Sequence, residues 1–188
     1  MTTFWWVRHG PTHEKVFTGW RDVPADLSDT AALTRLSAFL PSEAVVISSD
    51  LVRSRDTATA IQGARQRLPD HAGLREFDFG EWDGMPFDKI AETWPELSRT
   101  YWEQPGDVRA PGGESWNESE ARIEAARQEI AALGHDHVIA VAHFGAILTQ
   151  VRVAARCTPY EVLAHKIDNL SVTCIPPEGP ATLINHLP

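Results

Sequence analysis

The chain has 188 residues, of which 43% are hydrophobic and 23% charged, and its formal net charge is −9. These values are typical of one globular domain, spanning 1–188, that is long enough to bury a core. The acidic balance argues against general nucleic-acid binding, which needs a basic surface. We expect neither a membrane span nor a signal peptide, and the two distant cysteines favour a reducing, cytoplasmic location.

The first third of the chain predicts two strand–helix pairs. Residues 3–8 (TFWWVR) form a bulky apolar strand in which Trp5 and Trp6 face opposite sides, so helices on both faces of the sheet would bury both rings. Three leucines at helical spacing then predict a helix that Ser28 caps. Residues 44–49 predict a short buried strand, and the helix that follows is expected to be capped by Asp50.

The middle of the chain is less regular. Residues 74–84 (LREFDFGEWDG) predict a strand or an extended piece closed by glycine. Residues 85–115 are helical in part and broken by prolines, and we expect them to form a cap region. Six aromatic side chains in and just before this segment predict an aromatic-rich cap region: Phe79, Trp82, Phe87, Trp94, Tyr101 and Trp102. An apolar or cyclic ligand would fit there.

The last third predicts helix and strand in alternation. Asn117 and Glu120 resemble a capping box for a helix that ends at Gly134. Residues 137–143 (HVIAVAH) predict a buried strand followed directly by a helix, and two more strands follow near the C-terminus. The fold class predicted is α/β, a three-layer α/β/α sandwich with a mostly parallel central sheet.

Charged and imidazole side chains stand at three predicted strand ends. Arg8 and His9 follow the first strand, Arg53 lies one turn into the helix after the second, and His143 ends the strand at 137–143. Ligands bind at the carboxyl ends of parallel strands in such sheets, so these four residues should meet. Two arginines at a helix N-terminus suit a dianionic phosphate, and an imidazole among them can attack phosphorus.

An acid is also needed to protonate the leaving oxygen. Glu76 is the carboxylate best flanked by apolar residues, which favour the protonated form that an acid requires. Its neighbours Asp78, Glu81 and Asp83 remain alternatives.

Seven segments in order resemble one family. They are RHGPT, FTGWRDVP, SSDLVRSRDTA, LREFDFGEWDG, PGGES, VAHFGAIL and IDNLSVT. With them the chain resembles the histidine phosphatase superfamily, the phosphoglycerate-mutase-like group, over nearly its whole length. Within that group it is similar to the small-phosphatase branch that includes α-ribazole phosphatases.

The resemblance implies roles for five residues. His9 would be phosphorylated and then hydrolysed, while Arg8, Arg53 and His143 would hold the phosphoryl group. Glu76 would donate a proton and then act as the base for water. The implied enzyme is a metal-independent phosphatase, without cofactor, for a small phosphorylated metabolite.

The resemblance also implies that Thr18, Gly19 and the backbone after His143 line the pocket. Two positions depart from the family pattern. Lys15 stands where an asparagine is usual, and Phe144 replaces the glycine that commonly follows the second histidine. Phe144 adds bulk at the pocket edge, which bears on the leaving group and leaves the phosphoryl chemistry intact.

Three alternatives stay open. A mutase is disfavoured because 85–111 offers only Lys89, Arg99 and Arg109, without a paired-arginine segment. A pseudo-enzyme that binds phosphate or phosphoproteins would keep the same pocket. Eight histidines would also suit a metal-binding protein, but their spacing matches no zinc site. The oligomeric state expected is a monomer or a homodimer.

Overall fold

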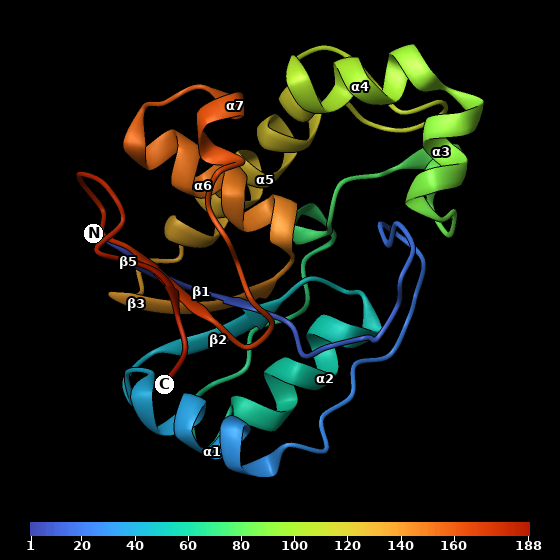
Figure 1. Cartoon of the computed structure of the whole chain (residues 1–188). Helices are drawn as coiled ribbons and strands as arrows, with labels where there is room; N and C mark the ends of the chain where they lie inside the picture. Colours follow the sequence, from blue (N-terminus) through green and yellow to red (C-terminus); the bar gives the residue numbers. More distant parts are fainter.

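The computed structural model describes residues 1–188, which fold around one five-stranded sheet with helices on both faces (Figure 1). The strands are β1 (Thr3–Arg8), β2 (Val45–Ser48), β3 (His137–Ala142), β4 (Val172–Ile175) and β5 (Leu183–His186). The helices are α1 (Thr30–Phe39), α2 (Val52–Ile61), α3 (Phe87–Thr93), α4 (Pro95–Glu103), α5 (Trp116–Ala131), α6 (Phe144–Ala155) and α7 (Pro159–Val162). Two short 3-10 turns, η1 (Ala72–Leu74) and η2 (Gly80–Trp82), lie between α2 and α3. The predicted α/β sandwich is confirmed.

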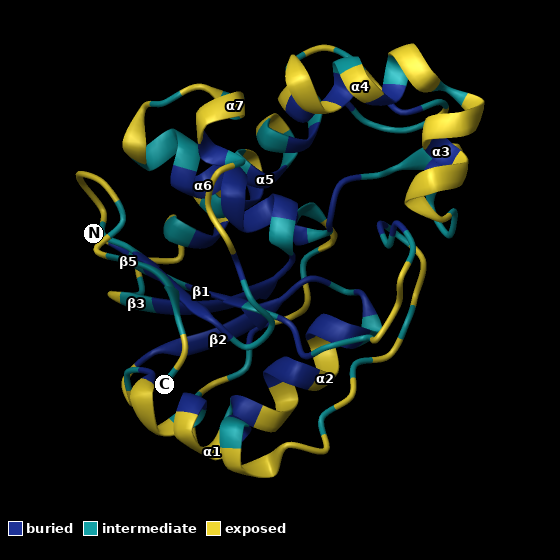
Figure 2. Ribbon diagram, viewed as in Figure 1, coloured by how far each residue is buried: buried dark blue, intermediate teal, exposed yellow.

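The strand order β2-β3-β1-β4-β5 places β1 in the middle of the sheet. β1 and β2 both run parallel to β3, whereas β4 is antiparallel to β1 and to β5. The sheet is therefore mostly but not entirely parallel. In the register, Arg8 lies opposite Ala142 and Ser48 opposite Val141, so the carboxyl ends of three strands meet at one edge. β2 and β3 are buried along almost their whole length, whereas half of the residues of β1 are only half-buried (Figure 2).

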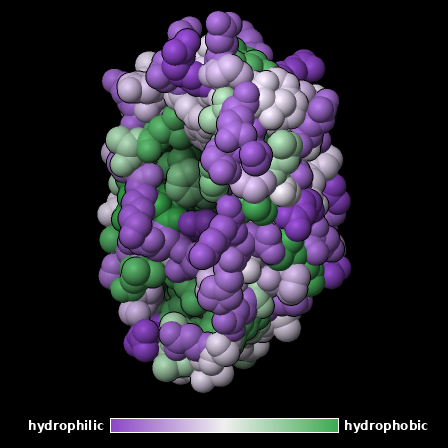
Figure 3. All heavy atoms as spheres, turned by 45° about the vertical axis from the view of Figure 1, so that its right-hand side comes forward, coloured by the Kyte–Doolittle hydropathy of each residue, from purple (hydrophilic) through white to green (hydrophobic).

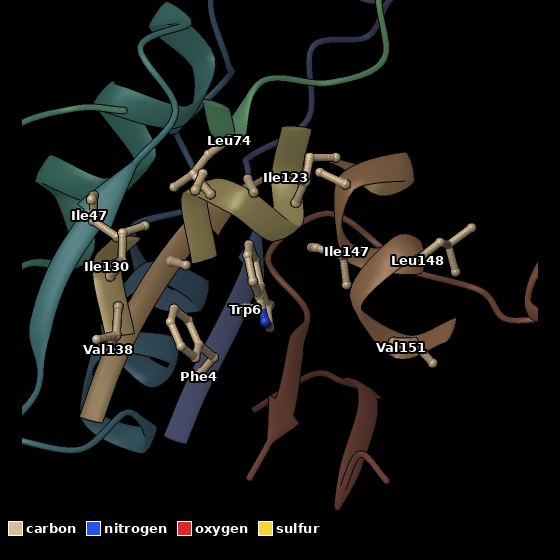
Figure 4. Packing of buried hydrophobic residues seen from close by; sticks show 14 of the residues in the cluster. Phe4, Trp6, Ile47, Leu74, Ile123, Ile130, Val138, Ile147, Leu148 and Val151 are labelled. Atoms are coloured by element: carbon tan, nitrogen blue, oxygen red, sulfur yellow. The ribbon is translucent and has the colours of Figure 1, made fainter. Parts of the chain in front are cut away.

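Alternating side chains of the strands point to opposite faces of the sheet and pack into two separate hydrophobic cores. Phe4 and Trp6 of β1 pack with Ile130 of α5 and Ile147 of α6 on one face (Figure 4). The opposite face packs against α1 and α2. Trp6 is fully buried, but Trp5 is only half-buried, so the prediction that both rings are buried is right for Trp6 alone.

Two predicted helix caps are each wrong by one residue. Asp29, and not Ser28, caps α1 by accepting a hydrogen bond from the backbone N–H of Ala32. Asp50 does not cap α2, because its carboxylate instead binds the guanidinium of Arg75. This ion pair fixes the segment that leads to residue 76.

The capping box of α5 also lies two residues earlier than predicted. Ser115 accepts from the backbone of Glu118, whose side chain accepts from the backbone N–H of Ser115. Asn117 is already inside the helix and donates to Asp107. The serine of the PGGES segment thus starts the helix that packs behind the site.

Residues 74–84 are predicted as a strand or an extended piece, but they form no strand of the sheet: residues 75–79 connect η1 to η2, which itself covers 80–82. Gly80 has φ +51°, and a Cβ there would lie 2.1 Å from the carbonyl oxygen of Pro111. This close approach ties the chain at 78–80 to the loop at 111–113. The segment 85–115 contains α3 and α4, and Figure 3 shows a hollow in the surface below this end of the molecule. No helix is both long and apolar enough to cross a bilayer.

Candidate active site

The three strand ends bring together the residues singled out from the sequence. The backbone N–H groups of His9 and Ser49, just beyond β1 and β2, donate to carbonyls of β3 at Ala142 and Val141. The imidazole rings of His9 and His143 lie with centroids 5.1 Å apart. Both rings are buried. Sheet register alone therefore positions the histidine pair.

The partners of His9 fix its tautomer. Its Nδ1 lies 2.7 Å from the carbonyl oxygen of Gly10, which can only accept, so Nδ1 carries the proton. Nε2 then keeps its lone pair, and no group of the chain hydrogen-bonds to it. Burial, Arg53 and Arg8 hold the pKa of His9 well below its usual value, although the bond to Gly10 acts in the opposite direction. His9 is a neutral imidazole with a free nucleophilic nitrogen.

His143 has the opposite tautomer. Its Nδ1 accepts a hydrogen bond of 3.2 Å from Nε of Arg53, so the proton sits on Nε2. Nε2 lies 2.7 Å from Oγ of Ser49 and 3.3 Å from Oγ of Ser54. Burial and the nearby Arg53 hold the pKa of His143 well below its usual value. Two buried serines thus orient a neutral second histidine, and the sequence analysis did not single them out.

Arg53 connects His143 to the loop that follows β1. Its Nη2 donates to the carbonyl of Gly19 at 2.6 Å, and its Nη1 donates to the carbonyl of Arg21 at 2.8 Å. The guanidinium is 1% exposed, and burial lowers its pKa. Three of its five N–H groups are used, so two remain for an anion.

Arg8 has spare donors as well. Nη1 donates to the carbonyl of Ile167 at 2.6 Å, while the buried Nε has no partner in the chain. An unpaired buried donor is costly unless a ligand satisfies it. Burial lowers the pKa of Arg8, and the Glu76 carboxyl raises it. The charge of Glu76 likewise raises the pKa of Arg53, although burial lowers it more.

Glu76 lies against the N-terminus of α6. Its Oε2 accepts from the backbone N–H of Gly145 at 3.1 Å, and its Oε1 accepts from those of Phe77 and Ala146 at 3.0 and 3.3 Å. The surroundings of Glu76 are thus more polar than its apolar neighbours in the sequence suggest. A Cβ at position 145 would lie 2.6 Å from Oε1, so only glycine allows this approach. Glu76 is 6% exposed, and Gly145, which donates to its carboxylate, lies two residues after His143.

A second set of residues, missed in the sequence analysis, holds the backbone of Glu76. Nη2 of Arg122 donates to the carbonyl of Glu76 at 3.0 Å, and the same guanidinium pairs with Glu114. The indole N–H of Trp20 donates to the same carbonyl at 2.7 Å. The guanidinium of Arg75 lies 4.8 Å from the ring of Trp20. Nothing in the sequence near Arg122 marks it, because its partners are 8 to 49 residues away.

The predicted pocket residues differ in their placement. The carbonyl of Gly19 binds Arg53, whereas the hydroxyl of Thr18 donates to the carbonyl of Val16 and is half-buried. Phe144 is half-buried, and the guanidinium of Arg8 lies 5.5 Å from its ring centroid. Lys15 is exposed and forms no ion pair.

The remaining sequence candidates lie outside this group of side chains. Asp83 accepts from the backbone N–H groups of Gly19 and Arg21, and so fixes the loop after β1. Asp78 accepts from the backbone of Gly80, and Glu81 is exposed. No group of three or more His, Cys, Asp and Glu side chains is arranged to hold a metal ion.

Comparison with known proteins places this arrangement in a family. The family model of the histidine phosphatase superfamily (branch 1) matches residues 4–187. The chain is 28% identical over 175 residues to a 2,3-bisphosphoglycerate-dependent phosphoglycerate mutase of Afipia carboxidovorans, covering 86% of this chain and 84% of that one.

Two solved structures share the fold. Mycobacterial glucosyl-3-phosphoglycerate phosphatase superposes with a TM-score of 0.86 at 21% identity, covering 100% of both chains. The α-ribazole phosphatase from Shigella flexneri gives a TM-score of 0.81 at 20% identity, covering 100% of this chain and 96% of that chain. Because the family model spans almost the whole sequence and its phosphoryl chemistry suits the site, the chain belongs to the histidine phosphatase superfamily, branch 1.

Proposed function

We propose that this protein is a phosphatase that hydrolyses a small phosphomonoester through a phosphohistidine on His9, without a metal ion. The observation that carries the proposal is the tautomer of His9: Nδ1–H binds the Gly10 carbonyl and leaves Nε2 free. That nitrogen belongs to a neutral ring beside Arg8 and Arg53, which still have donors for phosphate oxygens.

In the first step, Nε2 of His9 attacks phosphorus and forms the P–N bond while the bond from phosphorus to the ester oxygen breaks. Glu76 gives a proton to that oxygen, and the alcohol leaves. Arg8 and Arg53 stabilise the charge on the three phosphoryl oxygens in transfer, and His143 positions the guanidinium of Arg53 by accepting from its Nε.

In the second step, water attacks phosphorus and the P–N bond breaks, with the electron pair returning to Nε2. Glu76 takes the proton from the water, and inorganic phosphate leaves. Thr18, Gly19 and Phe144 line the entrance. Asn169, whose amide donates to the carbonyl of His9 at 2.8 Å, keeps the backbone of the nucleophile in place.

A phosphatase is favoured over a mutase by the basic side chains of residues 85–111. A mutase must hold a second anionic group of its substrate, and the segment 85–111 offers three basic side chains for this. Lys89 pairs with Glu92, and Arg109 pairs with Glu118. Arg99 is exposed, and no second arginine adjoins it in the sequence. We propose a small phosphorylated metabolite as the substrate and the cytoplasm as the location.

The first test is hydrolysis of p-nitrophenyl phosphate in excess EDTA by the wild type and by His9→Ala. We expect activity that survives EDTA and is lost in the variant, while the circular dichroism spectrum stays unchanged. Activity that EDTA abolishes would overturn the metal-independent mechanism. Equal activity in the two proteins would overturn the role of His9.

A second test separates the acid from the nucleophile. Glu76→Gln should slow an alkyl phosphate, whose alcohol needs a proton to leave, far more than p-nitrophenyl phosphate. Asp83→Asn is the matched control, because Asp83 binds loop backbone instead of α6. Equal slowing of both substrates by Glu76→Gln would assign the proton to another residue.

A further inference from the structure

Aromatic side chains that the phosphoryl chemistry does not use lie next to the phosphate site. A Cβ at Gly19 would lie 3.0 Å from Cδ2 of Phe79, and the carbonyl of this glycine binds Arg53. The ring of Phe17 packs edge-on against Phe79 with centroids 5.0 Å apart. Phe79 is half-buried and contacts both the main core and the small core under α3 and α4. Aromatic contacts therefore lead from Arg53 toward the segment 85–115.

The same contacts continue to the surface. Phe17 lies 4.5 Å from the ring of Phe87 and 5.9 Å from that of Trp102. Phe87 is 60% exposed and Trp102 is 39% exposed, although both are large apolar side chains. Single exposed apolar residues are common, but neighbouring ones that form a patch mark a binding surface. Figure 3 shows that the wall of the hollow below this end of the molecule is hydrophobic and its rim hydrophilic.

A further ring comes from a different element. Phe144 directly follows His143, and the guanidinium of Arg8 lies 5.5 Å from its centroid. This contact holds the ring beside the arginine that is proposed to bind phosphate. The phosphate site therefore has an aromatic neighbour on α6 as well as on the side of Phe17 and Phe79.

Charges near this surface do not favour a second anionic group. Residues 12–22 and 85–111 contain five basic side chains. Three of them form ion pairs: Arg21 with Glu14, Lys89 with Glu92 and Arg109 with Glu118. Lys15 and Arg99 are exposed to water. A carboxylate or a second phosphate on the substrate would find no buried cation among these residues.

We propose that Phe17, Phe79, Phe87 and Trp102 form an aromatic subsite that binds the leaving group, and that the enzyme prefers phosphate esters of aromatic alcohols. This inference rests on the proposed phosphatase function. The substrate ring stacks on Phe87 and Trp102 while its phosphoryl group lies at Nε2 of His9. Each ring contact should raise kcat/KM about threefold to tenfold.

The test compares 1-naphthyl phosphate with phenyl phosphate, since their phenols are of similar acidity and differ mainly in ring area. We expect kcat/KM to be about 3 to 10 times higher for the naphthyl ester. In Phe87→Ala and in Trp102→Ala this ratio should fall toward one. Both side chains are partly exposed, so the variants should fold. Phe39→Ala is the matched control, because Phe39 is 38% exposed and packs against Trp5 and His186, away from the site.

A ratio near one in the wild type, or an unchanged ratio in both variants, would overturn the aromatic subsite. So would faster hydrolysis of 3-phosphoglycerate than of phenyl phosphate, which would point to Lys15 or Arg99 as the anion site. In either case, His9-dependent hydrolysis of p-nitrophenyl phosphate would leave the proposed function standing. If the wild-type protein hydrolysed none of these esters, both proposals would be overturned.

Binding provides a readout that does not need turnover. Calorimetric titration of the His9→Ala protein should show 1-naphthyl phosphate binding about 3 to 10 times more tightly than phenyl phosphate. Trp102→Ala in the same background should remove the difference. Equal binding of the two esters by the His9→Ala protein would contradict the aromatic subsite.

Discussion

Lowering the pH should destabilise the fold through its two buried histidines. In the folded protein the pKa of His9 and of His143 lies well below 6.5, their value in an unfolded chain. Below pH 6.5 the unfolded chain therefore binds protons that the folded protein does not, so stability is complete above this pH and falls as the pH falls through it. One pH unit below 6.5, each histidine contributes a loss of about RT ln 11, or ~1.4 kcal/mol. The pair contributes ~2.8 kcal/mol.

The assay is urea unfolding at pH 7.5 and 5.5 in phosphate-free buffers, since phosphate would bind the folded state. Other groups also titrate, so the informative quantity is the difference between wild type and variant. His143→Gln should reduce the loss of stability between the two pH values by ~1.4 kcal/mol. His165→Gln, which changes an exposed histidine, should reproduce the wild-type loss. If His143→Gln loses as much stability as the wild type, the histidine is not held neutral and the reasoning fails.

Three substitutions test the residues that position the site. Ser49→Ala removes the hydroxyl that lies 2.7 Å from Nε2 of His143. Losing a hydrogen bond worth ~0.5–1.5 kcal/mol should lower kcat/KM for p-nitrophenyl phosphate about 2- to 13-fold. An unchanged kcat/KM would show that Ser54 alone is enough to orient His143. Gly145→Ala places a Cβ 2.6 Å from the Glu76 carboxylate, so alkyl phosphates should slow about tenfold more than p-nitrophenyl phosphate, and equal slowing would contradict the displacement of the acid. Arg122→Met breaks the ion pair with Glu114 and the hydrogen bond to the backbone carbonyl of Glu76. The free energy of unfolding, measured in urea, should fall by about 2–4 kcal/mol. A loss under about 1 kcal/mol would show that Trp20 holds this backbone without Arg122.

The fold was predictable because the central strands can be recognised from their runs of apolar residues. Residues 4–7 and 138–142 are continuous apolar runs, which is typical of strands covered on both faces. The polar residues that end each run then had to meet at one sheet edge, and Arg8, His9 and His143 do so. The helix caps were less predictable, because neighbouring polar residues such as Ser28 and Asp29 are equally suited to cap.

The residues that orient the site were not predictable, because their contacts are distant in sequence. Ser49 lies 94 residues from His143, and Arg122 lies 46 residues from Glu76. The surroundings of Glu76 illustrate the same point. Its sequence neighbours are apolar, yet the backbone N–H groups that bind it come mainly from α6, a helix about 70 residues away. Local sequence indicates which residues can react, and tertiary contacts determine how their side chains are oriented.

The most direct measurement of the central claim is the mass of the intact protein, quenched during turnover of p-nitrophenyl phosphate under conditions that preserve phosphohistidine. We predict one added phosphoryl group, mapped by peptide fragmentation to His9 and absent from His9→Ala. The label should persist longer in Glu76→Gln, because this residue is proposed as the base for water. A label on His143, or turnover with no phosphoryl group on the protein, would contradict the account.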